Sequence, residues 1–238
     1  MKSYILFGVQ RSGNHGIINL ILKSNNKNYV HINNSVLNYN LFNKFSQIEI
    51  KNRTNKKGQF IGFKDAEMII LSLENKVIDY TELEKFIDSK CILLLRNPYN
   101  NFASLFKSYE NKKLGINRKI KSINFLKKIW KSYAKNILDN NNIIIIIYDL
   151  FYKDSNYRNS IFNKLELQYD EKYLYEISGN GISSFERKNN NASKLNIFSR
   201  YEKFLDNELY INLIINDIEL RNLWNQIKKK FNFTTNDP

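Results

Sequence analysis

The chain alternates short continuous apolar runs with turns and with segments whose apolar residues recur at helical spacing. Short apolar runs bounded by turns are typical of buried strands, and a continuous run is typical of a strand buried on both faces of a parallel sheet. We therefore expect strands at residues 4–7, 29–32, 59–65, 91–95 and 143–150.

Helical spacing follows most of these runs. The segments that we expect to be helical are 17–22, 66–73, 77–88, the residues after Pro98, 125–138 and the C-terminal region from about residue 201. Ranges 35–58 and 109–124 are polar and predict loops. Only two prolines and no linker-like stretch interrupt the 238 residues, so we expect one α/β domain spanning residues 1–238.

Basic residues exceed acidic ones, and the formal charge is +14. A basic surface suits an anionic partner such as a nucleotide, a nucleic acid or an acidic lipid, and the alternative is that many lysines are simply solvated surface. The single Cys91 cannot form an internal disulfide, and its apolar surroundings predict a buried thiol. The sequence shows no leader pattern and no run of membrane-spanning length, so we expect a soluble, cytoplasmic protein.

A glycine-bearing loop follows the first apolar run, and its sequence is Gly8-Val9-Gln10-Arg11-Ser12-Gly13-Asn14-His15-Gly16. A strand, such a loop and a helix in this order direct backbone N–H groups and a helix N-terminus at a phosphate. Gly13 and Gly16 allow an anion to approach closely, and Arg11 and Ser12 add a charge and a hydroxyl. The loop predicts a phosphate site, and the alternative is an ordinary strand-to-helix turn.

This loop differs from that of ATP-type P-loop proteins, which carries Lys and then Ser or Thr after its second glycine. Asn14 and His15 occupy those two positions. A kinase or NTPase would lack both its phosphate-binding lysine and its metal-binding hydroxyl, and we disfavour that class.

A second stretch with the same layout is the apolar run 91–95, which ends in Arg96 and is followed by Pro98 and a helical segment with Ser104. Pro98 fits the first position of a helix. A guanidinium can bind a phosphate through two N–H donors, and a hydroxyl can share it. Arg96 and Ser104 therefore predict a second phosphate contact, and the alternative is a surface arginine and an unrelated serine.

Candidate acids and bases stand where other apolar runs end. Lys64 and Asp65 close the run 59–65, Glu67 follows them, and His31 lies near the end of 29–32. A carboxylate or an imidazole beside an acceptor hydroxyl could act as a general base. Asp65 could instead cap a helix at 66–73, and His31 could be bonded to neighbouring backbone.

The two phosphate motifs resemble those of the sulfotransferases that use 3′-phosphoadenosine 5′-phosphosulfate (PAPS). Arg11-Ser12-Gly13 is similar to their 5′-phosphosulfate loop, in which Lys or Arg precedes Ser-Gly-Thr-Thr, with Asn14-His15 in place of the threonines. Arg96, Pro98 and Ser104 keep the spacing of their 3′-phosphate motif, Arg-Asp-Pro-x-Asp followed by Ser, with Asn97 in place of the first acid.

Two weaker matches support the same resemblance. Lys64-Asp65 matches half of a strand end, Lys-Asp-Pro-Arg, that occurs in bacterial members of the family, and Ala66-Glu67 replaces its second half. Tyr148-Asp149-Leu150 resembles the family's Tyr-Glu-Asp-Leu after a later strand, and 159–167 fits the helix that usually follows it in the family.

The resemblance implies a three-layer α/β fold of the P-loop-like type with a central parallel sheet. It also implies PAPS as the donor, 3′-phosphoadenosine 5′-phosphate (PAP) as its product, and in-line, metal-free transfer to an acceptor hydroxyl or amine, with a glycan as the expected acceptor. The implied catalytic residues are Arg11, Lys64 and a base among Asp65, Glu67 and His31. The implied nucleotide-binding residues are Arg11, Ser12, Gly13, Asn14, His15, Gly16, Arg96, Ser104 and, on a late loop, Ser184, Arg187 and Lys188.

Two other classes of function stay open. A basic nucleic-acid-binding protein would account for the charge but not for the spacing of Arg96 and Ser104, and its binding would weaken steeply with salt. A catalytically inactive relative would account for the departures at Asn14-His15 and Ala66-Glu67.

Overall fold

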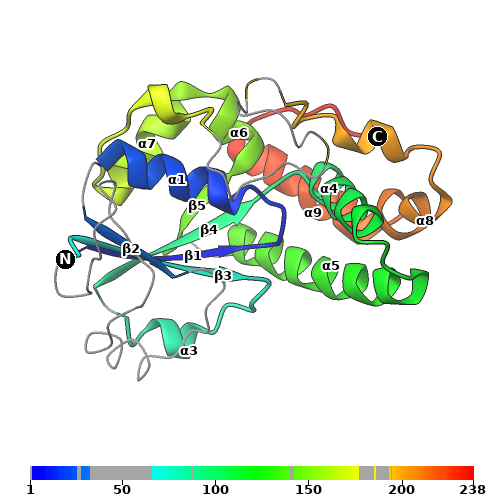
Figure 1. The fold of residues 1–238 in the computed structure, drawn as a ribbon, viewed down its shortest axis with the longest axis horizontal. Helices are drawn as coiled ribbons and strands as arrows, with labels where there is room; N and C mark the ends of the chain where they lie inside the picture. The colour runs from blue at the N-terminus through cyan, green and yellow to red at the C-terminus, as the bar shows by residue number, and fades with distance from the viewer. Residues whose placement is uncertain are drawn as a thin grey trace.

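The structure is a computed structural model that describes residues 2–25, 28–32, 66–86, 88–139, 142–176, 185, 193 and 195–238. Within these residues the chain forms a central sheet with helices on both faces (Figure 1). No helix in this part of the chain has the length and the apolarity needed to cross a bilayer.

The five strands that the described residues form are all parallel, in the order β2-β3-β1-β4-β5. Their bounds are β1 Lys2–Gly8, β2 Tyr29–Ile32, β3 Met68–Glu74, β4 Ser89–Leu95 and β5 Ile144–Ile147. The chain leaves β1 toward β2 on one side of the sheet and leaves β4 toward β5 on the other side. The carboxyl ends of strands whose connections diverge in this way form the crevice where open α/β sheets bind ligands.

Helices and short helical turns make up most of the remaining described chain. Their bounds are α1 Asn14–Asn25, α3 Tyr80–Leu83, α4 Pro98–Asn111, α5 Ile116–Asp139, α6 Tyr148–Lys153, α7 Ser155–Leu165, η2 Glu171–Tyr173, η4 Arg200–Phe204, α8 Glu208–Tyr210, η5 Ile211–Ile215 and α9 Ile218–Phe231.

Side chains alternate across the sheet and form two cores. On one face Ile5 and Phe7 of β1 pack with residues of α4, α5 and α9, including the fully buried Trp130. On the other face Tyr4 and Leu6 pack with residues of α1, α6 and α7, the layer drawn above the sheet in Figure 1. Full burial of one such side chain stabilises the fold by about 1.5–3 kcal/mol. The cores therefore hold the strand ends, and the loops that follow them, in fixed places.

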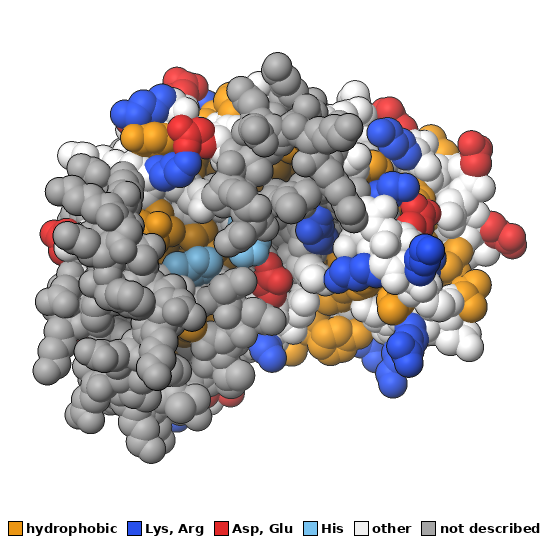
Figure 2. All heavy atoms as spheres, in the orientation of Figure 1, with side chains coloured by type: hydrophobic (Ala, Val, Ile, Leu, Met, Phe, Trp, Pro, Cys, Tyr) orange, Lys and Arg blue, Asp and Glu red, His pale blue; other side chains and the backbone are white. Residues whose placement is uncertain are grey.

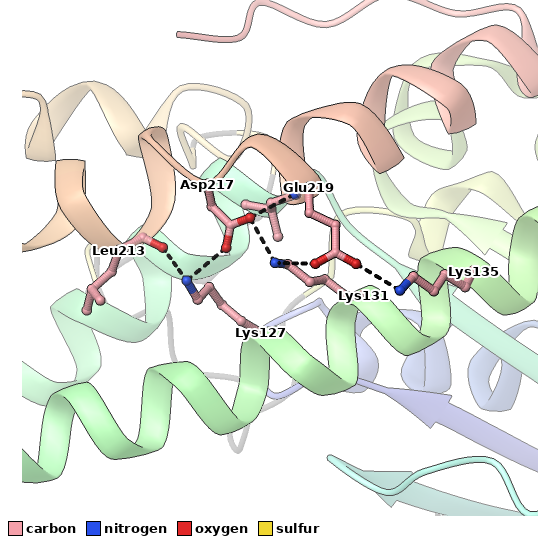
Figure 3. Close-up of polar contacts among 7 residues, drawn as sticks. Lys127, Lys131, Lys135, Leu213, Asp217 and Glu219 are labelled. Carbon is pink, nitrogen blue, oxygen red and sulfur yellow. Dashed lines mark hydrogen bonds and ion pairs between the residues drawn. The ribbon is translucent and has the colours of Figure 1, made fainter.

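An ion-pair ladder joins α5 to the start of α9 (Figure 3). Asp217 forms ion pairs with Lys127 at 2.9 Å and with Lys131 at 2.8 Å. Glu219 forms ion pairs with Lys131 at 2.9 Å and with Lys135 at 2.8 Å. The Asp217 carboxylate is the shielded member, with 13 % of its side chain exposed against 49 % for Glu219. Exposed pairs contribute little, so the stabilising part of the ladder is centred on Asp217.

The expected fold class is confirmed, since a parallel sheet lies between helical layers. The strands expected at 4–7, 29–32 and 91–95 are confirmed as β1, β2 and β4. The run 143–150 forms the shorter β5, because α6 already begins at Tyr148. Pro98 occupies the first turn of α4, as expected, and Asn97 caps that helix.

Several expectations are wrong. The segment 66–73, expected to be helical, supplies β3, because its apolar run is buried between β1 and β2 and this burial overrides its helical spacing. The helix expected at 77–88 is reduced to α3, and the loop expected at 109–124 is mostly the end of α4 and the start of α5. Cys91 is only partly buried, although burial raises its pKa to about 11. The expected strand 59–65 and loop 35–58 lie outside the described residues.

Candidate phosphate-binding site

The loop between β1 and α1 is tightly turned and depends on a glycine. Arg11 and Gly13 have φ angles of 70° and 98°, a region that only glycine adopts without strain. A Cβ atom on Gly13 would lie 2.2 Å from Cε2 of Tyr148. Glycine is therefore required here both by the backbone angle and by the ring that covers the loop.

Asn101 of α4 ties this loop to the second motif. The hydroxyl of Ser12, which is fully buried, donates to Oδ1 of Asn101 at 2.8 Å. The amide Nδ2 of Asn101 donates to the Gln10 carbonyl at 2.9 Å. The Ser12 side chain thus fixes the position of the loop relative to α4.

Arg96 follows the last residue of β4, and its guanidinium lies between the two motifs. Nη1 donates to the Arg11 carbonyl at 3.1 Å and reaches Oγ of Ser104 at 3.5 Å, while Nη2 donates to the Ile197 carbonyl. The guanidinium also stacks 4.7 Å above the centroid of the Tyr148 ring. Arg96 is only 2 % exposed, and its buried Nε finds no hydrogen-bond partner among the described residues. Such an unmet donor costs about 1–3 kcal/mol and is a place for a ligand acceptor.

A second arginine reaches the same hydroxyl from a distant part of the chain. Arg200, in η4, donates from Nη1 to Oγ of Ser104 at 2.9 Å, and its backbone N–H donates to Oδ1 of Asn100 at 2.7 Å. Ser104 in turn donates to the Asn100 carbonyl at 2.9 Å. The guanidiniums of two arginines that are 98 % and 94 % buried therefore converge on one serine, an arrangement suited to an anion.

Asn97 stands where the sulfotransferase motif has an aspartate, and its neighbours explain the change. Its Nδ2 donates to Oδ1 of Asp237 at 2.7 Å, and its backbone N–H donates to Asp149 at 2.8 Å. Burial raises the pKa of Asp149, although Arg96 and the Asn97 N–H act in the opposite direction. An aspartate at position 97 would bring a second carboxylate against Asp237.

Titratable side chains also surround the N-terminus of α1 on the side of β3. The rings of His15 and His31 lie 6.4 Å apart, and Nε2 of His31 is 3.0 Å from Oγ of Ser72. The amide Nδ2 of Asn14 donates to Oε1 of Glu74 at 3.0 Å. Figure 2 shows the chain's two histidines close together on one face, beside acidic and basic side chains.

The electrostatic balance at the loop is positive. Burial and the nearby Arg96 guanidinium lower the pKa of Arg11, and the Glu74 carboxylate acts in the opposite direction. Two cations held close together destabilise each other's charged forms, and a bound anion would relieve this.

The structure brings together one part of the expected site. Arg11, Ser12, Arg96 and Ser104 meet at the ends of β1 and β4, and Gly13, Asn14, His15 and Gly16 form the turn into α1. Glu67 lies at the amino end of β3, where it accepts from the Asn28 N–H at 3.2 Å, on the order of 20 Å along the strand from the site edge. Lys64, Asp65, Ser184, Arg187 and Lys188 lie outside the described residues.

Three residues of this region were missed by sequence reasoning. Arg200 belongs to a C-terminal segment without a recognisable motif, so only the fold reveals it. The sequence places Tyr148 at a strand end but does not indicate that its ring covers Gly13 and Arg96. A helix at 66–73 does not predict Glu74 at the site, although the apolar run of this segment is a signal for a strand.

Neither a protein-family model nor a curated protein matches the sequence. Solved structures do match. The sulfotransferase domain from the curacin biosynthetic pathway has a TM-score of 0.53 at 15 % identity, over 99 % of both chains. The sulfotransferase domain from the Synechococcus PCC 7002 olefin synthase has a TM-score of 0.51 at 16 % identity, over 99 % of this chain and 95 % of that one. The chain therefore has the fold of these sulfotransferase domains, which confirms the sequence resemblance at the level of fold.

Proposed function

We propose that the protein is a sulfotransferase that moves the sulfuryl group of PAPS to an acceptor hydroxyl or amine. The observation that carries the proposal is the hydrogen bond from Arg96 to the Arg11 carbonyl, which joins two cationic motifs at adjacent strand ends. PAPS carries phosphate groups on both the 5′ and the 3′ positions of one ribose, and two adjoining cationic loops suit such a ligand. The fold shared with sulfotransferase domains supports the same function.

The described side chains fit the two phosphates of this donor. Arg96 with its unmet Nε, Arg200 and Ser104 would hold the 3′-phosphate, which adenosine monophosphate lacks. The turn from Gly13 into α1 would hold the 5′-phosphate through backbone N–H groups. Bound PAPS supplies a sulfuryl group on a phosphate leaving group. Arg11 would stabilise the charge that develops on that phosphate.

Binding at the second motif requires an exchange of hydrogen bonds. The Ile197 carbonyl now accepts from Nη2 of Arg96, and the guanidinium is almost fully buried. Hydrogen bonds between two charged groups are about twice as strong as neutral ones, so a phosphate oxygen can replace this carbonyl. The hydrogen bond from Arg96 to the Arg11 carbonyl can persist and keep the two motifs in the same relative position.

The acceptor is the less specific part of the proposal. Of the hydroxyl and amine acceptors, we propose a hydroxyl, with glycans as the first class to test. His31, which lies near His15 at the site, and Asp65 with Lys64, outside the described residues, are retained from the sequence as candidate catalytic groups. Glu67 is not retained, since it lies at the opposite end of β3.

The test is calorimetric titration with PAP, AMP and ATP of the wild type, Arg96→Ala and Arg96→Lys. We expect PAP to bind much more tightly than AMP, and Arg96→Ala to weaken PAP binding by about 10- to 100-fold, the loss of charged hydrogen bonds of about 1.5–3 kcal/mol. Arg96→Lys keeps the charge but loses the bidentate geometry, so its affinity for PAP should lie between those of the wild type and Arg96→Ala.

Lys90→Ala is the matched control, because it removes a cation from the other end of the same strand, where Lys90 pairs with Glu166 at 2.8 Å. This variant should bind PAP like the wild type. Equal binding of all three nucleotides, or no binding, would contradict the proposal. Weak binding of every polyanion with a steep dependence on salt would indicate a nucleic-acid-binding protein instead.

A further inference from the structure

The carboxyl end of β3 is fastened to the phosphate loop. Glu74 is the last residue of β3 and lies directly beside Gly8, the last residue of β1. The next residue, Asn75, donates its N–H to the Gly8 carbonyl at 3.1 Å and accepts the Gln10 N–H on Oδ1 at 2.7 Å. The backbone on both sides of Glu74 is therefore held in a fixed position relative to the loop.

The Glu74 side chain is turned toward the start of α1. Ser72 and Glu74 share one face of β3, the face that α1 covers, since alternate residues of a strand point the same way. Asn14, the first residue of α1, donates from Nδ2 to Oε1 of Glu74 at 3.0 Å. A Cβ atom on Gly8 would lie 2.0 Å from Oδ1 of Asn14, so glycine at position 8 makes room for this amide.

Several charged or titratable groups face this carboxylate. The charge of the Glu74 carboxylate acts to raise the pKa of Arg11. It also acts to raise the pKa of Tyr133, which lies on the other face of the sheet. On the α1 face, His31 of β2 contacts Ser72, two residues before Glu74, and its ring lies 6.4 Å from that of His15 at the start of α1. Glu74 is thus a half-buried carboxylate at the edge of the site, next to the cation assigned to the leaving phosphate.

We propose that Glu74 is the general base of the transfer, an inference that rests on the proposed function. In the step, the acceptor O–H gives its proton to the Glu74 carboxylate as the acceptor oxygen bonds to sulfur. The bond from sulfur to the bridging phosphate oxygen breaks, and its electron pair stays on the 5′-phosphate. Asn14 is a positioning residue, because its amide holds one carboxylate oxygen. This role gives a reason for Asn14, where the sulfotransferase loop has a threonine.

The position also fits the chemistry better than the carboxylates expected from sequence. A base has to stand beside the sulfuryl group, at the carboxyl ends of the strands. Glu74 stands there, and Glu67, on the same chain segment, stands at the amino end of β3. Glu67→Gln is therefore a matched control that removes the same carboxylate from the wrong end of the strand.

The first readout is binding of PAP, measured by calorimetry on the wild type, Glu74→Gln and Glu67→Gln. A carboxylate beside a phosphate site repels the ligand, so Glu74→Gln should bind PAP as well as the wild type or about threefold more tightly. Glu67→Gln should be unchanged. A residue that only supported the loop would instead weaken PAP binding when replaced.

The second readout is release of labelled sulfate from PAPS with water as the acceptor, which needs no knowledge of the natural acceptor. Loss of a general base typically lowers the rate by about 10²–10⁴-fold. We expect Glu74→Gln and Glu74→Ala to release sulfate at least about 100-fold more slowly than the wild type, and added formate to restore part of the rate of Glu74→Ala only.

The outcomes separate the two proposals. Retained PAP binding, lost sulfate release and rescue by formate would establish Glu74 as the base. Unchanged sulfate release in Glu74→Gln, a parallel loss of binding and release in that variant, or a wild-type rate equal to that in buffer would overturn this inference, while PAP binding by the wild type would still support the proposed function. Absence of PAP binding by the wild type would overturn the proposed function, and the inference with it.

Discussion

Asp217 offers a quantitative test of how the structure is held together, because its carboxylate serves two purposes at once. It caps α9 by accepting the Leu220 N–H at 3.0 Å, and it pairs with Lys127 and Lys131 of α5 (Figure 3). Asp217→Asn removes the charge but keeps an oxygen for the cap, and asparagine is as good a cap as aspartate. The substitution therefore isolates the ion pairs.

The magnitude follows from the pKa of Asp217. Burial alone would raise this pKa, but hydrogen bonds from Lys127 and Lys131 outweigh burial and lower the pKa from 3.8 to about 2. At about 1.36 kcal/mol per pH unit, this difference corresponds to roughly 2.4 kcal/mol. Because the surrounding lysines are in part open to solvent, we discount it to about 1–1.5 kcal/mol.

The contribution has a defined pH dependence. The folded-state pKa lies below the unfolded value, so the carboxylate stabilises the protein at neutral pH, and this stabilisation is lost as the pH falls from about 4 to about 2. Urea unfolding of the wild type and Asp217→Asn should therefore differ by about 1–1.5 kcal/mol at pH 7, and the two curves should converge below pH 4.

The control is Asp154→Asn, which changes the cap of α7, where Asp154 accepts the Tyr157 N–H at 3.0 Å and forms no ion pair with any described residue. Its effect should be small and should not follow the ladder's pH dependence. A loss in Asp217→Asn that stays constant from pH 7 to pH 3 would refute the electrostatic reasoning and point to packing.

Two further substitutions test the candidate site. Gly13→Ala combines a strained backbone angle with a clash against the Tyr148 ring, so we expect a loss of about 1–3 kcal/mol by urea unfolding and weakened PAP binding by calorimetry; a variant as stable as the wild type would contradict this geometry. Asn97→Asp should destabilise the protein by about 1–3 kcal/mol, because it places a carboxylate against that of Asp237. Adding Asp237→Asn to this variant should restore its stability in thermal melts. A double variant as unstable as Asn97→Asp alone would contradict a role for this contact.

Sequence patterns were sufficient for the central part of the fold. The runs that became β1 and β4 are continuous and apolar because both faces of these strands are buried, and each ends at a residue that departs from the pattern. Arg96 comes directly after β4, and Arg11 lies in the loop that follows β1, so both motif residues are located by those strand ends. Their placement beside each other depends on β1 and β4 being neighbours in the sheet, a pairing that the structure reveals.

The rest depended on contacts that local patterns do not encode. The segment containing Ser72 has a mixture of spacings that suits a helix as well as a strand, and only its burial beside β1 decides between them. Arg200 is 96 residues from its partner Ser104, and Asp237 is 140 residues from Asn97. Pairings at such separations arise from the tertiary fold, so no local signal could reveal them.

The hydrogen bond from Arg96 to the Ile197 carbonyl has a consequence for the kinetics of the proposed nucleotide binding. Arg96 is 2 % exposed, so under the proposed function a phosphate would reach its guanidinium only after the Ile197 carbonyl has been displaced. The apparent affinity would then be the intrinsic affinity reduced in proportion to the fraction of molecules with the carbonyl displaced. Association would be a two-step process whose observed rate levels off at high ligand concentration. Return of the carbonyl segment over a bound nucleotide would prolong the lifetime of the complex.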